Sequence, residues 1–412
     1  MSSSSSAEPA GEGRRIRIAL LGSTGSVGRQ TVEVIEHDPS FEVVGIAGGR
    51  SSTVLGDQAR RLQPEVVVLA DHAVRAGLGD LPPRTRTAFG DEALEELAGR
   101  ADLDLVVIGT SGIVSLRAVL AALRAGTAVA TANKETLVAG GHLVMPLARG
   151  LAARRADVDF RDPLASPLAW IRPIDSEHSA IWQCLVGERP TSVARLVLTA
   201  SGGPFLDLDA GALARVTPDA ALRHPTWRMG AKITIDSATL ANKGLEVIEA
   251  NRLYDVPYEA IDVVIHPQSV VHSAVLFVDG SLKAQLGTPD MRLPIQYALT
   301  HPDRRPSPAA PPDLVAVARL DFAAPDEVRF PALRIAREAG RAGPWATASL
   351  IAADDVAVAR FLAGTLDFLG IPRLLEAAVT RFGSPRGSDP AVPDLLALDA
   401  EIRAIYADGA VP

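Results

Sequence analysis

The chain has 412 residues, 47% hydrophobic and 22% charged, a composition that predicts a globular protein with two or three domains. Its net charge of −8 and its isoelectric point near 5.6 argue against nucleic acid as a partner. The single cysteine, Cys184, excludes an internal disulfide and favours a reducing compartment, so we expect a cytoplasmic protein. No apolar run approaches the roughly 18 residues of a transmembrane helix, and no membrane partner is expected.

The chain begins with a serine-rich stretch, residues 1–14, that lacks the apolar core of a signal peptide. We expect a disordered tail there, because the stretch has too few apolar residues to bury. A predicted strand at 15–21 follows, and then the glycine-rich segment G-S-T-G-S-V-G at 22–28, which leads into a helical pattern. Strand, glycine turn and helix are together typical of a dinucleotide site, in which the helix N-terminus binds pyrophosphate. The spacing is G-x-x-G-x-x-G, so a glycine-rich turn without a ligand is the alternative.

The second predicted strand, 41–47, indicates which dinucleotide is bound. NAD enzymes usually carry an acidic residue after this strand, which bonds the ribose 2′-hydroxyl. Here the strand is followed by Gly49, Arg50 and Ser51, a cation and a hydroxyl with no acid. This pattern favours a 2′-phosphate and hence NADP(H), the alternative being that Arg50 is a solvated loop residue.

Further apolar runs at 65–70, 103–108 and 127–131 alternate with helical patterns at 92–98 and 116–125. This alternation predicts a Rossmann-type, doubly wound parallel sheet. Small and polar residues follow two of the strands, at 109–112 and 131–135. Ligands of such sheets bind beyond the carboxyl ends of the strands, so both loops are expected near the nicotinamide.

Two carboxylates in the middle of the chain, Asp175 and Glu177, lie two residues apart. On an extended segment they would point to the same side and suit Mg²⁺ or Mn²⁺ better than zinc. The alternative is a helix N-terminus, where acidic residues interact favourably with the helix dipole. Both interpretations can hold together.

The richest stretch is 235–249, I-D-S-A-T-L-A-N-K-G-L-E-V-I-E. Ser237, Asn242 and Lys243 supply the hydroxyl, amide and ammonium donors that bind a phosphate. Glu246 could neutralise Lys243 or bind a divalent cation. The alternative, a polar helix start with a Lys–Glu surface pair, stays open on spacing alone; the family resemblance given below, together with the acids above, favours separate contacts of Lys243 and Glu246 to one substrate complex.

Two loops complete the predicted site. Residues 201–205, S-G-G-P-F, follow a predicted strand at 196–200 and offer amides and a hydroxyl to an anion. Residues 224–230, H-P-T-W-R-M-G, predict a lid, in which the tryptophan covers area and the glycine permits a hinge. An ordinary surface loop is the alternative for the lid.

The remaining patterns complete the predicted domains. Strands at 263–269 and 274–277 are expected to be antiparallel, a proline cluster predicts a linker, and Ala-rich helical patterns begin after residue 331. The predicted fold is α/β, with an N-terminal Rossmann-type doubly wound sheet, a central α+β catalytic domain and a C-terminal helical domain. The expected divisions are 1–14 tail, 15–160 NADPH-binding domain, 161–292 catalytic domain, 293–315 linker and 316–412 helical domain.

Seven motifs in order resemble one family, 1-deoxy-D-xylulose 5-phosphate reductoisomerase. They are G-S-T-G-S-V-G, A-N-K-E, D-S-E-H, S-G-G-P-F, H-P-T-W, D-S-A-T-L-A-N-K-G-L-E and H-P-Q-S, and the similarity spans residues 15–382. The resemblance implies an NADP-dependent oxidoreductase that makes 2-C-methyl-D-erythritol 4-phosphate for isoprenoid precursor synthesis. It also implies a sugar phosphate substrate, Mg²⁺ or Mn²⁺ with Co²⁺ as a further candidate, and a homodimer.

The resemblance also assigns roles to individual residues. The implied metal ligands are Asp175, Glu177 and Glu246, which with Lys134 form the catalytic set. The implied substrate contacts are Lys134, Ser176, Glu177, Ser201, His224, Ser237, Asn242, Lys243 and Glu246. The implied NADPH contacts are Thr24, Gly25, Ser26, Val27, Gly49, Arg50, Ser51, Asn133, Glu135 and Gly230.

Three features depart from the family pattern. Ser51 stands where an asparagine is common, the pattern L-N-A-A-N-E reads L-I-A-A-D-D at 350–355, and the segment 161–173 is longer and richer in proline. None of them touches the implied metal ligands. The competing hypotheses are another Rossmann-type NADP-dependent reductase with a metal-free site, and a non-catalytic nucleotide-sensing homologue.

Overall fold

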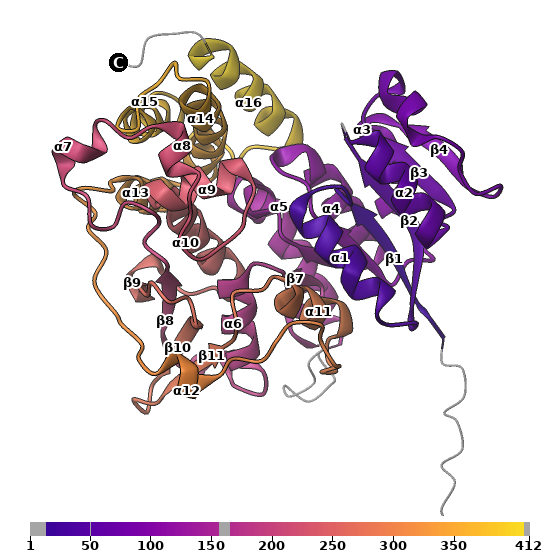
Figure 1. Cartoon of the computed structure of the whole chain (residues 1–412), viewed down its shortest axis with the longest axis horizontal. Helices are drawn as coiled ribbons and strands as arrows, with labels where there is room; N and C mark the ends of the chain where they lie inside the picture. Colours follow the sequence, from indigo (N-terminus) through magenta and orange to yellow (C-terminus); the bar gives the residue numbers. More distant parts are fainter. Residues whose placement is uncertain (1–13, 50, 156–164, 408–412) are drawn as a thin grey trace, which may run out of the picture.

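The computed structural model describes residues 14–49, 51–155 and 165–407. It has the predicted α/β architecture: a parallel sheet flanked by helices, a second smaller sheet, and a helical region formed by the C-terminal part of the chain (Figure 1). The predicted tail at 1–14 lies almost wholly outside the described residues. Within the described ranges, no helix combines the length and the apolar character needed to cross a membrane.

The first sheet has seven strands in the order β4-β3-β2-β1-β5-β6-β7, and every neighbouring pair is parallel. After β4 the chain returns to the other side of β1, so the order reverses between β1 and β5. A crevice at such a reversal is where open α/β sheets bind ligands. The strands are β1 Ile16–Leu21, β2 Phe41–Gly48, β3 Val66–Leu69, β4 Arg86–Phe89, β5 Leu105–Ile108, β6 Ala128–Thr131 and β7 Ile171–Pro173.

Helices cover both faces of this sheet, which is why its central strands are continuous apolar runs. They are α1 Ser26–Glu36, α2 Ser52–Leu62, α3 Gly90–Ala98, α4 Leu116–Ala125 and α5 Lys134–Ala153. Gly28 in the first turn of α1 permits the close approach of helix and strand, because a Cβ there would lie 2.2 Å from the Gly22 carbonyl oxygen. The glycine turn therefore brings the N-terminus of α1 to the crevice.

The second sheet has the order β11-β10-β8-β9, formed by β8 Val193–Ala200, β9 Ile261–Ile265, β10 Val271–Phe277 and β11 Leu282–Leu286. The expected antiparallel strands at 263–269 and 274–277 are found as β9 and β10, which run in opposite directions but are not neighbours, because β8 lies between them and pairs with both. In the connection between them Ser269 has a φ of +50°, and His266 Nε2 accepts hydrogen bonds from Val270 N and Val271 N.

Three helices join this sheet to the rest of the molecule. Helix α6 Ser176–Leu185 packs on β10 and β11, and α10 Ala241–Tyr254 packs against α5 and against α13. The short helix α9 Ala231–Thr239 precedes α10 and also contacts α14. The helices α6, α9 and α10 therefore stand between the two sheets and the C-terminal region.

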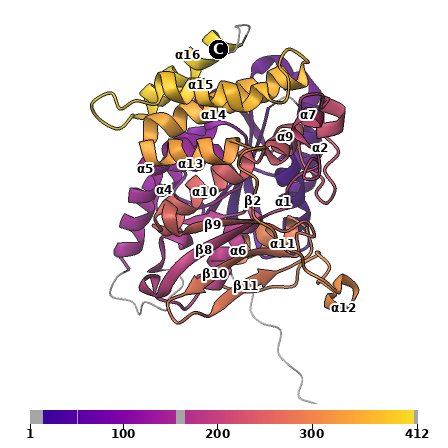
Figure 2. The ribbon, with the colours of Figure 1, turned by 90° about the vertical axis from the view of Figure 1, so that its left-hand side faces the viewer.

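The C-terminal region is helical as predicted, with α13 Ala332–Ala342, α14 Pro344–Leu362, α15 Gly370–Phe382 and α16 Val392–Tyr406. Figure 2 shows these helices at one end of the molecule and the second sheet at the other, with α10 between them.

Part of the expected linker at 293–315 is instead helix α11 Arg292–Thr300, which packs against α1 and α6. Its buried face, which includes Ile295, Tyr297 and Leu299, explains why a helix forms there. The short helices are α7 Ala210–Leu213, α8 Pro218–Ala221 and α12 Leu314–Val317.

Candidate active site

One cleft brings together most of the predicted site residues. It lies where the N-terminus of α1, the loop after β6 and the N-terminus of α6 face α9 and α10, and it encloses about 930 Å³, open solvent included. The predicted residues that line it are Ser26, Val27, Lys134, Asp175, Ser176, Glu177, Ser201, His224, Gly230, Ser237, Asn242, Lys243 and Glu246.

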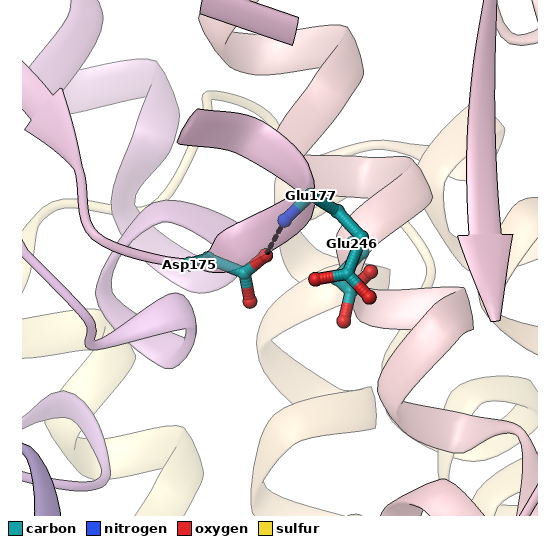
Figure 3. A group of neighbouring side chains, drawn as sticks. All are labelled: Asp175, Glu177 and Glu246. Atoms are coloured by element: carbon teal, nitrogen blue, oxygen red, sulfur yellow. Dashed lines mark hydrogen bonds between the residues drawn. The ribbon is translucent and has the colours of Figure 1, made fainter. Parts of the chain in front are cut away.

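Three carboxylates converge at one end of the cleft. Asp175 is the N-cap of α6, its Oδ1 accepting a hydrogen bond from Glu177 N, and Glu177 lies in the first turn of that helix. Glu246 faces them from α10 (Figure 3). One oxygen from each of the three lies within 4.8 Å of the others. Both sequence interpretations of Asp175 and Glu177 therefore hold, since the helix N-terminus itself carries the carboxylate pair.

Two ammonium groups neutralise these carboxylates. Lys134 Nζ lies 2.6 Å from Asp175 Oδ2 and 3.7 Å from Glu246 Oε1. Lys243 Nζ lies 2.8 Å from Glu177 Oε1 and also bonds Glu246 Oε2. Lys243 and Glu246 therefore form a buried ion pair, where separate contacts to one substrate complex were expected.

Burial and charge set the protonation of this group. Burial, together with the neighbouring Asp175 and Glu177, raises the pKa of Glu246 to about 8. Burial alone would also raise the pKa of Asp175, but the positive charges of Lys134, His178 and Lys243 outweigh it and hold that pKa below the ordinary range. The carboxylates therefore repel one another strongly enough that one of them is protonated near neutral pH.

This arrangement fits a divalent cation. Carboxylate oxygens are the ligands that Mg²⁺ and Mn²⁺ prefer, and two ammonium groups already place two positive charges against the three carboxylates. A bound cation would relieve the repulsion that raises the pKa of Glu246. Asp175, Glu177 and Glu246 would hold it.

Hydroxyl, imidazole and amide groups line the cleft beyond the carboxylates. Ser201, after β8, lies with its Oγ 2.9 Å from His224 Nε2. His224 Nδ1 accepts hydrogen bonds from Thr226 N and Trp227 N, so Nε2 carries the proton and donates to Ser201. Burial lowers the pKa of His224, which keeps the ring neutral. Asn242 Nδ2 donates to Glu246 Oε1, and its Oδ1 is buried without a hydrogen-bond partner in the described chain.

The glycine pair after Ser201 fixes the distance between β8 and α9. Gly203 has a φ of +68°, and a Cβ there would lie 2.9 Å from the Ser237 carbonyl oxygen and from Ala238 Cα. Only glycine combines this backbone conformation with such a close approach. The hydroxyls of Ser201 and Ser237 are held on the same wall of the cleft as a result.

The predicted lid, residues 224–230, borders the cleft. His224, Trp227, Arg228, Met229 and Gly230 all line it, and Thr226 Oγ1 donates to the Pro267 carbonyl oxygen. Trp227 is half-buried, with its ring centroid 6.1 Å from that of His272. The segment therefore lies over the cleft in this conformation.

The predicted cofactor residues lie along the carboxyl edge of the first sheet. Ser26 and Val27 line the cleft from the first turn of α1, whose N-cap Gly25 offers no side-chain cap, so the first backbone N–H groups are open to an anion. Thr24 reaches the end of β2, and a Cβ on Gly49 would meet no atom within 4 Å. Ser51 caps α2 without a side-chain bond. Arg50 lies outside the described residues.

Six of the described cofactor candidates do not line the cleft: Thr24, Gly25, Gly49, Ser51, Asn133 and Glu135. Asn133 uses its side chain within the protein: Oδ1 accepts from Thr136 N, and Nδ2 donates to the Thr110 and Gly112 carbonyl oxygens. Glu135 is buried and points toward Lys232 of α9, 3.9 Å away. Asn133 thus ties together the loops after β5 and β6.

The structure adds residues that sequence reasoning missed. Ala132, Ile233, Leu240 and Met291 give the cleft an apolar wall, for which single apolar residues carry no sequence signal. Behind the carboxylates, His178 Nε2 lies 3.3 Å from Glu249 Oε2, and both residues are buried. Glu249 was detectable, because it lies three residues after Glu246 on the same helix face.

Together, the fold and the site are those of a Rossmann-type protein that holds three clustered carboxylates and a set of hydroxyl, amide and ammonium donors in one cleft. The family described as 1-deoxy-D-xylulose 5-phosphate reductoisomerase matches residues 18–141, and its C-terminal domain descriptions match residues 171–254 and 286–405. The chain belongs to the 1-deoxy-D-xylulose 5-phosphate reductoisomerase family.

Named relatives agree over almost the whole length. The enzyme named 1-deoxy-D-xylulose 5-phosphate reductoisomerase from Pelotomaculum thermopropionicum is 47% identical over 386 residues, 93% of this chain and 95% of the relative. The one from Thermomicrobium roseum is 46% identical, over 95% and 97% respectively. A solved structure of DOX-P reductoisomerase with NADPH, fosmidomycin and magnesium superposes with a TM-score of 0.85 at 37% identity, covering 95% of this chain and 97% of that one. The Zymomonas mobilis enzyme with NADPH gives 0.83 at 36% identity, over 96% and 98%.

Proposed function

We propose that this chain converts 1-deoxy-D-xylulose 5-phosphate to 2-C-methyl-D-erythritol 4-phosphate, using NADPH and a divalent metal ion. The reaction is a step of non-mevalonate isoprenoid precursor synthesis. The relatives' names and the NADPH and magnesium complexes of similar structures support this function.

One observation carries the proposal at the level of this chain's own residues. A single cleft holds three clustered carboxylates, a set of phosphate-type donors and the first turn of a dinucleotide-binding helix. A substrate with a phosphate at one end and a hydroxyketone at the other fits this division. A reductase with a metal-free site does not require the carboxylate cluster.

The phosphate end of the substrate is assigned to Ser201, Ser237, Asn242 and Lys243. Hydroxyl and amide groups donate to phosphate oxygens, and the ammonium group adds charge. His224 joins this set, because its protonated Nε2 already donates to Ser201 Oγ and can donate to an anion in the same place. Binding energy from this end positions the reacting carbons.

The hydroxyketone end is assigned to the carboxylate cluster, with Ser176 beside it. Asp175, Glu177 and Glu246 would hold a divalent ion, which would supply Lewis acidity toward the ketone and its neighbouring hydroxyl. Lys134, whose ammonium lies 2.6 Å from Asp175, adds a proton donor and a positive charge where oxygen charge develops. When the substrate complex forms, Lys243 exchanges its bonds to Glu177 and Glu246 for the phosphate.

The reductive half of the reaction is assigned to the first sheet. NADPH supplies hydride to the rearranged aldehyde. The first turn of α1, with Thr24, Gly25, Ser26 and Val27, is assigned to its pyrophosphate, and Gly49, Arg50 and Ser51 to its 2′-phosphate end. The lid at 224–230, with Gly230 at its end, excludes water while hydride is transferred.

The direct test is NADPH oxidation, followed at 340 nm, with 1-deoxy-D-xylulose 5-phosphate in the presence and absence of Mg²⁺ or Mn²⁺. We expect oxidation only when both substrate and metal are present. Equal rates without metal would favour a metal-free reductase, and no oxidation with either metal would favour a nucleotide-sensing homologue.

We further assign this enzyme to the cytoplasm as a homodimer. Four large apolar side chains, Val278, Leu282, Leu314 and Val315, are at least 58% exposed. They come from the β10–β11 hairpin and from α12, which both views place at the same end of the molecule (Figures 1 and 2). An exposed apolar surface of this kind suits self-association. Light scattering after size exclusion is expected to give twice the chain mass of 43.2 kDa, and a single chain mass would refute the dimer.

A further inference from the structure

The chain uses lysine very sparingly. Only four of its 41 basic residues are lysines: Lys134, Lys232, Lys243 and Lys283. Two of these belong to the cleft described above, and Lys283 is an exposed residue of β11. Lysine supplies a compact point charge where a planar guanidinium does not fit. The remaining lysine is Lys232, and we therefore expect it to occupy a site that requires a compact point charge.

Four carboxylates surround the Lys232 ammonium group. Nζ lies 2.5 Å from Asp354 Oδ2 and 2.8 Å from Asp236 Oδ2. Asp355 and Glu135 complete the cage at 3.6 and 3.9 Å. All four carboxylates are largely or fully buried, so these contacts are little screened by water.

The cage joins three parts of the fold. Glu135 comes from α5, two residues after the Asn133 that ties together the cofactor-side loops. Asp354 and Asp355 come from α14 of the C-terminal region, and Arg403 of α16 bonds Asp355 at 2.5 Å. Lys232 itself is the second residue of α9. One ammonium group therefore fixes the start of α9 to both neighbouring regions.

The position of Lys232 along the chain links this cage to the cleft. The lid ends at Gly230, two residues before Lys232, and Ser237 follows five residues after it on the same helix. Thr234 Oγ1 donates to the Gly230 carbonyl oxygen and fastens the lid end to the first turn of α9. A shift in that first turn would move the lid end and Ser237 together.

We propose that Lys232 is a positioning residue, whose ammonium group fixes the first turn of α9 against α5 and α14 so that the lid closes from a rigid end and Ser237 stays at the phosphate pocket. This inference rests on the lid and phosphate roles given under the proposed function. It adds a residue that lies outside the cleft and does not touch the substrate.

A conservative variant of the cage (the four carboxylates around Lys232) is Asp354→Asn. The Oδ1 atoms of Asp354 and Asp236 are buried and accept no hydrogen bond from a donor of the described chain. Both carboxyl groups contact the Lys232 ammonium group through Oδ2, which leaves each Oδ1 able to carry a proton. An asparagine at 354 would imitate the protonated carboxyl, with one oxygen for Lys232 and one N–H for Asp236.

The test compares Lys232→Met, Lys232→Met combined with Asp354→Asn, Asp354→Asn alone, and Lys283→Met in the full chain. Methionine keeps the length of the lysine stem and removes the charge. The double variant also removes one buried carboxylate, which protects folding. Lys283→Met is the matched control, since among residues 14–49, 51–155 and 165–407 Lys283 pairs only with the exposed Glu188, at 3.3 Å.

Two measurements separate positioning from general stability. The first is steady-state kinetics together with the NADPH dissociation constant. The second is trypsin cleavage at two exposed residues, Arg223 directly before the lid and Arg228 within it, with and without NADP⁺, Mg²⁺ and 1-deoxy-D-xylulose 5-phosphate. In both Lys232 variants we expect the KM for the sugar phosphate to rise five- to twentyfold and ligand protection of the lid to be lost, while NADPH affinity changes less than threefold.

Asp354→Asn and Lys283→Met are expected to keep wild-type KM and lid protection. A folded double variant with both properties unchanged would overturn the role of Lys232. A wild-type chain that oxidises no NADPH with this substrate would instead contradict the proposed function, so the two failures are distinguishable.

Discussion

At the scale of the residue, the cleft is organised by charges that satisfy one another only in part. Lys134 and Lys243 neutralise Asp175 and Glu177, and the third carboxylate, Glu246, is left with a pKa of about 8 because it is buried beside two others. Because the three carboxylates are only partly neutralised by the two lysines, binding of a divalent cation to them is expected to be favourable.

Asp175→Asn is expected to abolish metal-stimulated turnover. The change removes one ligand charge and the partner of Lys134, and we expect kcat to fall about 100-fold or more, a loss of roughly 3 kcal/mol of transition-state stabilisation. NADPH binding should persist, because Asp175 lies on α6 and not on the first turn of α1. Fluorescence titration measures NADPH binding, and the 340 nm assay measures turnover. The control is Asp91→Asn, a substitution at an exposed residue of α3. An active Asp175→Asn variant with ordinary metal dependence would refute the metal assignment.

At the scale of the element, α9 depends on two close contacts, one with the loop after β8 and one with α14. The first is the approach of Gly203 to Ser237 and Ala238. The second is the cage around Lys232. Each contact gives a prediction that a matched variant can check.

Gly203→Ala is expected to raise the KM for the sugar phosphate about tenfold and to lower the free energy of unfolding by roughly 1–3 kcal/mol. The added methyl group must displace α9, and Ser237 moves with it. Gly280→Ala is the control, because Gly280 has a φ of +85° but a Cβ there would meet no atom within 4 Å. Kinetics and urea unfolding should show a stability loss in both variants and a changed KM only in Gly203→Ala. A changed KM in Gly280→Ala as well would make the effect nonspecific.

The cage also predicts a pH dependence of stability. Burial raises the pKa of Asp236 and Asp354 above the ordinary aspartate value, even though Lys232 opposes the shift, and Glu135, Asp355 and Arg403 are the other charges in the cage. Between the ordinary and the raised pKa, the folded chain holds a proton that the unfolded chain has lost. The free energy of unfolding therefore falls as pH rises through this window.

Asp354→Asn removes one of the two titrating groups, so its fall in stability between pH 5 and pH 8 should be smaller than that of the wild type. Urea unfolding at the two pH values measures the difference. The carboxylates that both proteins share contribute equally to the pH dependence of the two proteins, so their contribution cancels in the comparison. An equal fall in the two proteins would mean that Asp354 ionises as an ordinary aspartate.

At the scale of the whole molecule, the proposed metal ligands come from two helices that belong to different layers. Asp175 and Glu177 lie on α6, which packs on the second sheet, and Glu246 lies on α10, which packs on α5 and α13. A cation held by all three therefore links these layers, and whatever binds only the folded chain stabilises it.

Metal removal is accordingly expected to lower thermal stability. At 100 times its dissociation constant, Mg²⁺ should add about 2.7 kcal/mol, which corresponds to a rise of a few degrees in Tm over the EDTA-treated protein. Glu246→Gln should lose most of this rise. Differential scanning calorimetry with and without EDTA measures it, and an equal rise in Glu246→Gln would place the stabilising metal elsewhere.

Sequence reasoning predicted what local patterns encode. The strands β1, β2, β3, β5 and β6 are mainly apolar runs, with Arg17 in β1 and Glu42 in β2 as the charged exceptions, whereas β4 is partly exposed and β7 has three residues, so neither carries a clear signal. Helix α5 gives no clear sequence signal, because Gly140, Gly141 and Pro146 interrupt its helical pattern. The two glycines are needed there, because Leu116 and Arg252 pack against them.

In the candidate site, too, local motifs could be predicted and contacts between distant parts of the chain could not. Clustered motifs identified the residues that line the cleft, and their chemistry suggested carboxylate and phosphate ends. The cage around Lys232 could not be predicted, because Glu135 and Asp354 lie about 100 residues or more from Lys232 along the chain, on either side of it. The position of β8 between β9 and β10 likewise depends on long-range pairing, which no local pattern records.

The lone thiol of the chain also has a practical consequence. Cys184 is buried in α6, and burial raises the pKa of its thiol to about 11, so at neutral pH it is neither ionised nor accessible to alkylating dyes. A cysteine introduced at exposed Arg228 would therefore be the one position that takes a maleimide fluorophore. Single-molecule or stopped-flow emission from that probe could time lid closure during turnover, with the native enzyme contributing no background label.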